Sequence, residues 1–223
     1  MDKRRRWIAL GVGATLSVAA GLAWAQVQQA VRPRPAEVAL PQSRAQRADL
    51  AQARTNPVAA RARVTLQQSP DKADVLAAAD ASSVPVLGPA SPALLRTARI
   101  FVSDAQYTLV VRDEGRLIEI HGTTRALQAP PEATWPPRPA PPAPRAAVRA
   151  DPLAAAMAQG RQAGLANLLA ERTEYGVDLS FVRFGAVYSV TFVCDDPAAA
   201  SCTEAAAIQF AAGLQVIGGG DRG

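Results

Sequence analysis

The stretch "QYTLVVRDEGRLIEIH", residues 106–121, decides the fold class of this 223-residue chain. Successive side chains of a β-strand point to opposite faces, and apolar residues here recur at every second position on both sides of the tripeptide 113–115. These residues are Tyr107, Leu109, Val111, Ile118 and Ile120. A three-residue connection that ends in glycine suits a tight turn closing in a left-handed position. The stretch therefore predicts a β-hairpin.

A second hairpin is predicted downstream. The runs "VDLSFVR" and "AVYSVTFVC", residues 177–183 and 186–194, flank Phe184-Gly185. In the second run Tyr188, Val190, Phe192 and Cys194 share one strand face. This face carries the bulkier side chains, so we assign it to the core.

Helix signals surround the hairpins, because a cap residue followed by proline typically starts a helix. Ser69-Pro70 and Ser91-Pro92 start two short helices, and Asp151-Pro152 starts one expected to continue through residues 153–172. Close packing against the sheet explains Gly160 and Gly164 in the last of these helices. A further helix is expected over 201–212 and a last short strand over 214–219. The fold class is thus α+β: a small antiparallel sheet built from two β-hairpins and packed by helices.

Two segments interrupt this pattern. Residues 26–68 contain few branched or aromatic side chains, which predicts a low-complexity, disordered arm with at most a short helix over 43–54. Within residues 129–150, eight of the 17 residues from 129 to 145 are proline, which predicts an extended linker or loop. One domain is therefore expected, composed of residues 69–128 and 151–218. Its glycine-rich tail, residues 219–223, is expected to fray.

The N-terminal residues 1–25 resemble a cleaved signal peptide. A basic start, Lys3 to Arg6, precedes an uncharged, largely apolar run that ends in the small-x-small pattern read by signal peptidase. We expect cleavage between Ala25 and Gln26 after Sec-type export, which places the mature chain in the periplasm or outside the cell. Twin-arginine export is the less favoured route, and an uncleaved signal is the alternative that would keep the chain on a membrane.

Charge argues against a nucleic-acid partner. The whole chain has 24 basic and 19 acidic residues, but cleavage after Ala25 leaves 20 and 18, a net charge of +2. A near-neutral chain without basic clusters lacks the electrostatic footprint of a nucleic-acid-binding protein.

The two cysteines, Cys194 and Cys202, are predicted to form a disulfide. Ser201 and Glu204 have the spacing of a capping box, so Cys202 is expected as the first residue of a helix that follows the strand ending at Cys194. Seven intervening residues allow the chain to return to disulfide distance, and export supplies an oxidising compartment. A redox C-x-x-C spacing is lacking, and one histidine in the chain is too few for a zinc site with these cysteines. No cofactor is expected.

One local cluster carries titratable groups of catalytic type. Glu119 and His121 lie on the same strand face, where a carboxylate could orient an imidazole for hydrolysis with Thr123 or a serine. The simpler interpretation is a histidine at the polar edge of a strand, because no recognised catalytic motif accompanies it. The favoured function is a non-catalytic binding or scaffolding domain of the cell envelope, with an envelope protein or cell-wall component as partner. The alternative is an envelope hydrolase that uses His121 with Glu119.

Overall fold

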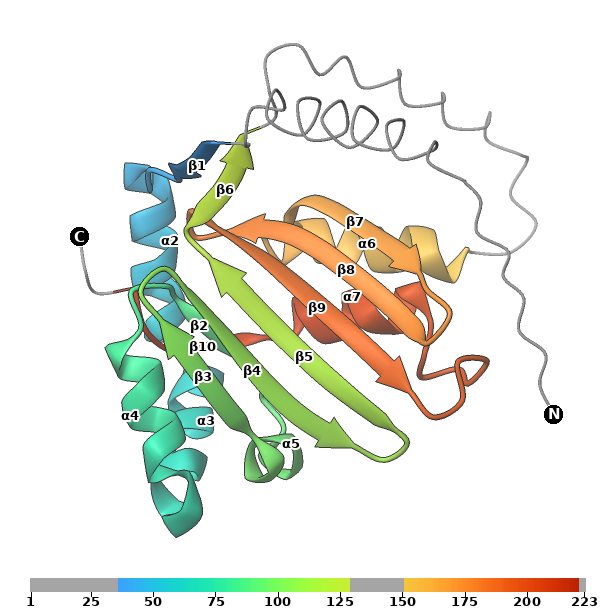
Figure 1. The fold of residues 1–223 in the computed structure, drawn as a ribbon, viewed down its shortest axis with the longest axis horizontal. Helices are drawn as coiled ribbons and strands as arrows, with labels where there is room; N and C mark the ends of the chain where they lie inside the picture. Colours follow the sequence, from blue (N-terminus) through green and yellow to red (C-terminus); the bar gives the residue numbers. More distant parts are fainter. Residues whose placement is uncertain (1–35, 129–150, 221–223) are drawn as a thin grey trace, which may run out of the picture. The chain divides into compact units, whose positions relative to one another are not determined.

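The computed structural model describes residues 36–128 and 151–220, and its centre is a six-stranded antiparallel sheet in the order β3-β4-β5-β9-β8-β7 (Figure 1). The strands span Arg99–Ser103 (β3), Gln106–Asp113 (β4), Arg116–Thr123 (β5), Ala166–Arg172 (β7), Gly176–Arg183 (β8) and Ala186–Cys194 (β9). Both predicted hairpins are confirmed, as β4-β5 and β8-β9, and they join where β5 pairs with β9. The predicted small sheet is wrong, because each hairpin gains a third strand, β3 or β7.

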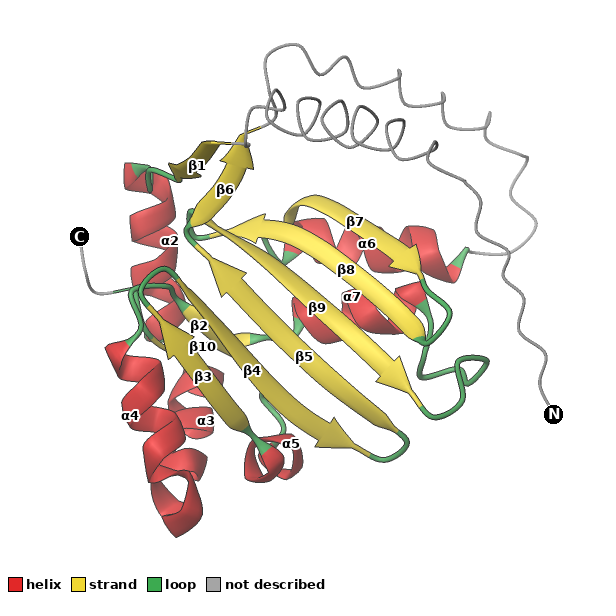
Figure 2. Cartoon of the chain, viewed as in Figure 1, coloured by secondary structure: helices red, strands yellow, loops and turns green. Residues whose placement is uncertain are grey.

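Helices lie on one side of this sheet, and Figure 2 shows some of them running behind its strands and others beside it. They span Arg44–Arg54 (α2), Pro57–Gln68 (α3), Ala73–Ala81 (α4), Pro92–Thr97 (α5), Pro152–Gln162 (α6) and Glu204–Ala212 (α7), with a 3-10 turn at Pro70–Lys72 (η1) before α4. The α+β class is therefore confirmed. None of these described helices has the length and apolar character needed to cross a bilayer.

Alternation of side chains fixes which face the helices cover. On β4, β5, β8 and β9 the apolar side chains of that face are at most 1% exposed: Tyr107, Leu109, Val111, Ile118, Ile120, Val177, Leu179, Phe181, Tyr188, Val190 and Phe192. Each such side chain contributes roughly 1.5–3 kcal/mol through its burial. A one-residue slip in register would turn the whole set to the other face, so the register is strongly specified.

Residues 44–54 and 57–68 are helical, which corrects the prediction of disorder for this part of the arm 26–68, whereas residues 26–35 lie outside the described residues. Ser43 caps α2 as expected for the short helix, but α3 was not expected. Leu50, Ala62 and Leu66 are at most 3% exposed. Alanines allow the helices to approach their neighbours closely, so a few leucines suffice to bury this layer. A count of bulky residues therefore underestimated the core.

The helix expected over 153–172 ends early, at Gln162. Gly164 has φ +82° and turns the chain towards β7 in a left-handed conformation. Asn167, with φ +52°, lies within β7 where its register shifts between Ala166 and Leu169. Gly160 does pack closely, because a Cβ there would lie 2.9 Å from Leu168 of β7 and 3.1 Å from Ile208 of α7. Gly164 is instead the residue that terminates the helix.

A short antiparallel pair of β2 (Val86–Gly88) and β10 (Gln215–Gly218) lies on the helical side of the sheet, and two tyrosines hold it there. The Tyr107 hydroxyl accepts the Leu87 N–H at 2.9 Å, and the Tyr188 hydroxyl donates to the Pro85 carbonyl at 2.9 Å. We call this arrangement the tyrosine clasp. Its two rings flank Gly122, where a Cβ would lie 2.4 Å from one ring and 2.9 Å from the other.

A second short pair joins β1 (Ala36–Ala39) to β6 (Arg125–Gln128). At the other end of the chain, Gly219 is buried and Arg54 donates to its carbonyl. The N–H of Gly220 donates to the carbonyl of Ser82 at 3.0 Å. These contacts correct the prediction of a fraying tail at its first two residues. The predicted signal peptide 1–25, with its cleavage bond between Ala25 and Gln26, and the proline-rich segment 129–150 lie outside the described residues.

Candidate functional site

His121 lies on the face of the sheet opposite the helices. It pairs across strands with Thr108 of β4 and Ser189 of β9, and Ser189 pairs in turn with Ser180 of β8. Residues paired in this way project from the same face, so these four half-buried side chains form a continuous polar row. Phe101 of β3 and Leu169 of β7, which are 65% and 47% exposed, stand at its two ends.

The polar row does not bring Glu119 into hydrogen-bonding contact with His121. The Nδ1 atom of His121 hydrogen-bonds the Thr108 hydroxyl at 3.2 Å. Glu119 shares the face of His121, as predicted, but sits one row away between Val110 and Thr191, and no hydrogen bond joins the two side chains in the described part of the chain. Backbone N–H groups of a central strand are engaged in the sheet ladders. They are therefore not free to stabilise an oxyanion.

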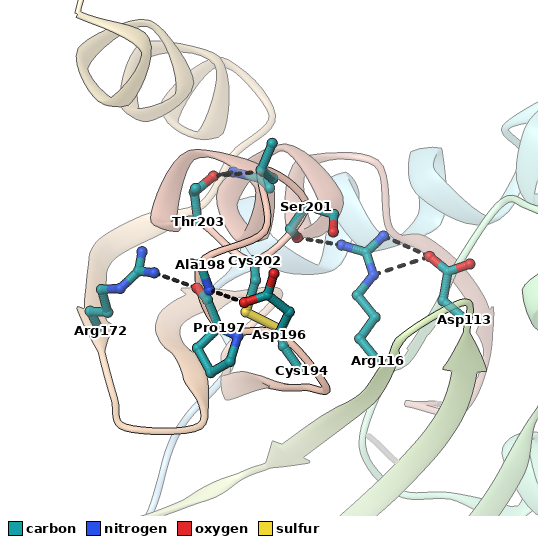
Figure 3. The surroundings of a disulfide bond; sticks show 12 residues. Asp113, Arg116, Arg172, Cys194, Asp196, Pro197, Ala198, Ser201, Cys202 and Thr203 are labelled. Carbon is teal, nitrogen blue, oxygen red and sulfur yellow. Dashed lines mark hydrogen bonds and ion pairs between the residues drawn. A yellow bond between two sulfur atoms is a disulfide. The ribbon is translucent and has the colours of Figure 1, made fainter.

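Cys194 and Cys202 form the predicted disulfide, with Cα atoms 6.4 Å apart (Figure 3). The local helix start differs from the prediction. Thr203 caps α7 by accepting the Ala206 N–H at 3.2 Å, whereas Cys202 precedes the helix in a turn. The capping box of Ser201 and Glu204 is therefore wrong, because the hydroxyl two residues later sits in the capping position.

Charged side chains fasten the loop that the disulfide closes (Figure 3). Arg116 donates to the Ser201 carbonyl at 2.6 Å and pairs with Asp113 at 2.7 Å. Arg172 donates to the Pro197 carbonyl. Cys202 is fully buried. This arrangement is that of a structural disulfide, and the described residues contain no group of three or more metal-ligating side chains.

A polar hollow of about 670 Å³ lies elsewhere, where α2, the end of α6, the β8–β9 turn and β10 meet. Its volume falls within the general range of small-molecule sites. Side-chain amides and one cation dominate its polar lining: Gln46, Gln52, Asn56, Gln162, Gln215 and Arg183, together with Asp49. We call it the Arg183 hollow. The sequence does not predict this hollow, because its residues come from four separate segments.

Arg183 is the central charged group of this hollow. Its guanidinium lies 4.6 Å from the centre of the Phe184 ring, and its hydrogen bond to the Leu214 carbonyl is long, at 3.4 Å. Burial lowers the pKa of Arg183, while the negative charge of Asp49 acts in the opposite direction. An arginine remains protonated at neutral pH. The hollow therefore contains a partly desolvated cation, and only one hydrogen bond from its N–H groups is found among the described residues.

Backbone strain occurs at the same place. Asn167 and Phe184 are the two non-glycine residues with positive φ among the described residues, each at +52°. Phe184 lines the hollow, and Asn167 follows Ala166, which also lines it. Positive φ at a bulky residue costs energy and tends to occur at functional sites. A phenylalanine before Gly185 in the predicted turn is the one feature of the sequence that marks this place.

No family model, no curated protein and no solved structure matches the chain.

Proposed function

We propose that this chain is a non-catalytic binding domain of the bacterial cell envelope, exported by a Sec-type signal that is cleaved between Ala25 and Gln26. The disulfide between Cys194 and Cys202 supports this location, because such bonds persist in oxidising compartments. The basic, apolar and small-x-small pattern of residues 1–25 supports it from the sequence.

The Arg183 hollow is the observation that carries the binding role. Its lining offers amide donors and acceptors around a single cation, which is suited to recognition. Neither a histidine nor a cysteine lines it, and its one carboxylate, on the exposed Asp49, has no adjacent nucleophile in that lining. These groups can orient a ligand, but they provide no activated nucleophile.

A cell-wall component is the partner that this chemistry favours, because peptidoglycan offers carboxylates, amides and hydroxyls to such a lining. An envelope protein is the other partner class. Co-sedimentation of the mature protein with purified peptidoglycan tests the first: we expect retention in the pellet, and a protein that stays in the supernatant contradicts it.

The alternative function, an envelope hydrolase, has one observation in its favour: Ser189 lies directly across from His121 in the polar row. A His121→Ala variant separates the two functions, and a Glu119→Gln variant tests the second residue of the alternative site. We expect no hydrolysis of ester substrates or purified peptidoglycan by the mature wild-type protein. Hydrolysis by wild type that is lost in a folded His121→Ala variant would overturn the binding proposal.

A further inference from the structure

The position of Arg183 suggests which ligand group enters the hollow. A guanidinium presents five N–H donors in a fork that matches a carboxylate. The Phe184 ring and the Leu214 carbonyl hold the guanidinium in place and leave most of these donors without a protein acceptor among the described residues. Preorganised, partly buried cations of this kind gain most from an oxyanion, because water screens the interaction poorly there.

The remaining lining narrows the class of ligand. Asp49 places a negative charge in the same hollow, which disfavours a dianion such as a phosphate monoester. The neutral amides of Gln46, Gln52 and Gln162 match hydroxyl or amide groups on the rest of the ligand. We propose that the Arg183 hollow binds a small monocarboxylate whose other groups are amides or hydroxyls, through a two-pronged contact from Arg183. This inference rests on the proposed binding function and specifies its ligand.

Paired probes with and without a carboxylate test this. The first pair is N-acetyl-D-alanine and its primary amide, which differ at the carboxyl group alone. The second is N-acetylmuramic acid and N-acetylglucosamine, which lacks the whole 3-O-lactyl group that bears the carboxylate. Affinity is obtained from the dependence of the melting temperature on ligand concentration. We expect the acid of at least one pair to bind about 10- to 100-fold more tightly than its neutral partner, which is the usual contribution of a hydrogen bond to a charged group.

Variants assign the effect to this hollow. Arg183→Gln should abolish the preference for the acid, whereas the matched control Arg96→Gln, an exposed arginine on α5, should retain it. Asp49→Asn removes the opposing charge and should strengthen binding of the acid by about two- to fivefold. If Arg183→Gln fails to fold, Gln52→Trp obstructs the hollow from the exposed face of α2 and should abolish binding with Arg183 in place.

The outcomes separate the two proposals. The ligand assignment is overturned if neither acid binds better than its neutral partner, or if the acid preference survives in a folded Arg183→Gln variant. Where Arg183→Gln does not fold, an acid preference that survives Gln52→Trp overturns it. If peptidoglycan still retains the protein in the pellet, the binding function stands and only the ligand assignment fails. If the protein also stays in the supernatant, both the ligand assignment and the cell-wall proposal fail.

Discussion

Replacing Gly122 with alanine should destabilise the domain, because this glycine makes room for the tyrosine clasp. A Cβ at position 122 would lie 2.4 Å from Cε1 of Tyr107 and 2.9 Å from Cε1 of Tyr188. Both rings are at most 1% exposed and their hydroxyls are tied to Pro85 and Leu87. They therefore have little room to move without losing those hydrogen bonds.

The expected magnitude follows from three contributions. Overpacking a core by one methyl group costs about 1–3 kcal/mol, and weakening one of the two tyrosine hydrogen bonds costs about 1 kcal/mol more. Alanine in place of glycine lowers the entropy of the unfolded chain and offsets about 0.4–1 kcal/mol of this. The free energy of unfolding should thus fall by about 1–3 kcal/mol, with a melting temperature lower by about 3–10 °C.

Urea denaturation of the mature protein measures this change, and Gly213→Ala is its matched control. Gly213 ends α7 with φ −85°, and a Cβ there would have its nearest contacts at 3.4 and 3.6 Å. That variant should be neutral or slightly stabilising. A Gly122→Ala protein within 0.5 kcal/mol of wild type would refute the argument that the rings cannot yield.

Three further predictions concern stability. Replacing both Cys194 and Cys202 with serine should lower the free energy of unfolding by roughly 2–3 kcal/mol by loop entropy, as measured by urea denaturation under non-reducing conditions; an unchanged midpoint would contradict this. Thr203→Ala should lower the free energy of unfolding by about 1 kcal/mol through loss of the α7 cap, whereas Ser201→Ala should change the urea midpoint little. Equal effects of the two substitutions would contradict the assignment of Thr203 as the cap. Burial raises the pKa of both tyrosines of the clasp, so the stability that their protonated hydroxyls contribute is fully present below about pH 10 and lost as pH rises further. Denaturation from pH 8 to 11 should show this fall, and a variant with phenylalanine at both positions should show a shallower one; identical slopes would contradict the assignment.

Period-two alternation was the most reliable sequence signal. It located both hairpins and the buried face that contains Tyr107 and Tyr188, because a half-buried strand must segregate its side chains by parity. The edge strands escaped this signal. β3 has no fully buried residue. The residues of β7 were predicted as part of the helix over 153–172, which ends early because of the left-handed Gly164.

Long-range placement accounts for the rest of what the sequence did not predict. The disulfide was predictable, because it depends on two local properties of the sequence: the strand face on which Cys194 lies and the seven residues between the two cysteines. The Arg183 hollow was not, because its α2 residues lie more than 100 positions before the other lining segments and only the fold brings them together. The α3 helix was missed for a related reason: its alanines form a core surface only where a neighbouring helix meets them.

The proposed ligand binds at the Arg183 hollow and not along the polar row that contains His121. The most direct test is the ¹H–¹⁵N spectrum of the mature protein titrated with N-acetylmuramic acid and N-acetyl-D-alanine. We predict that the amide resonances that shift cluster in the four segments that line the hollow, 46–56, 162–166, 182–184 and 212–216, with those of Thr108, His121 and Ser189 unmoved. Shifts centred on the polar row, or no shifts with either acid, would contradict the claim.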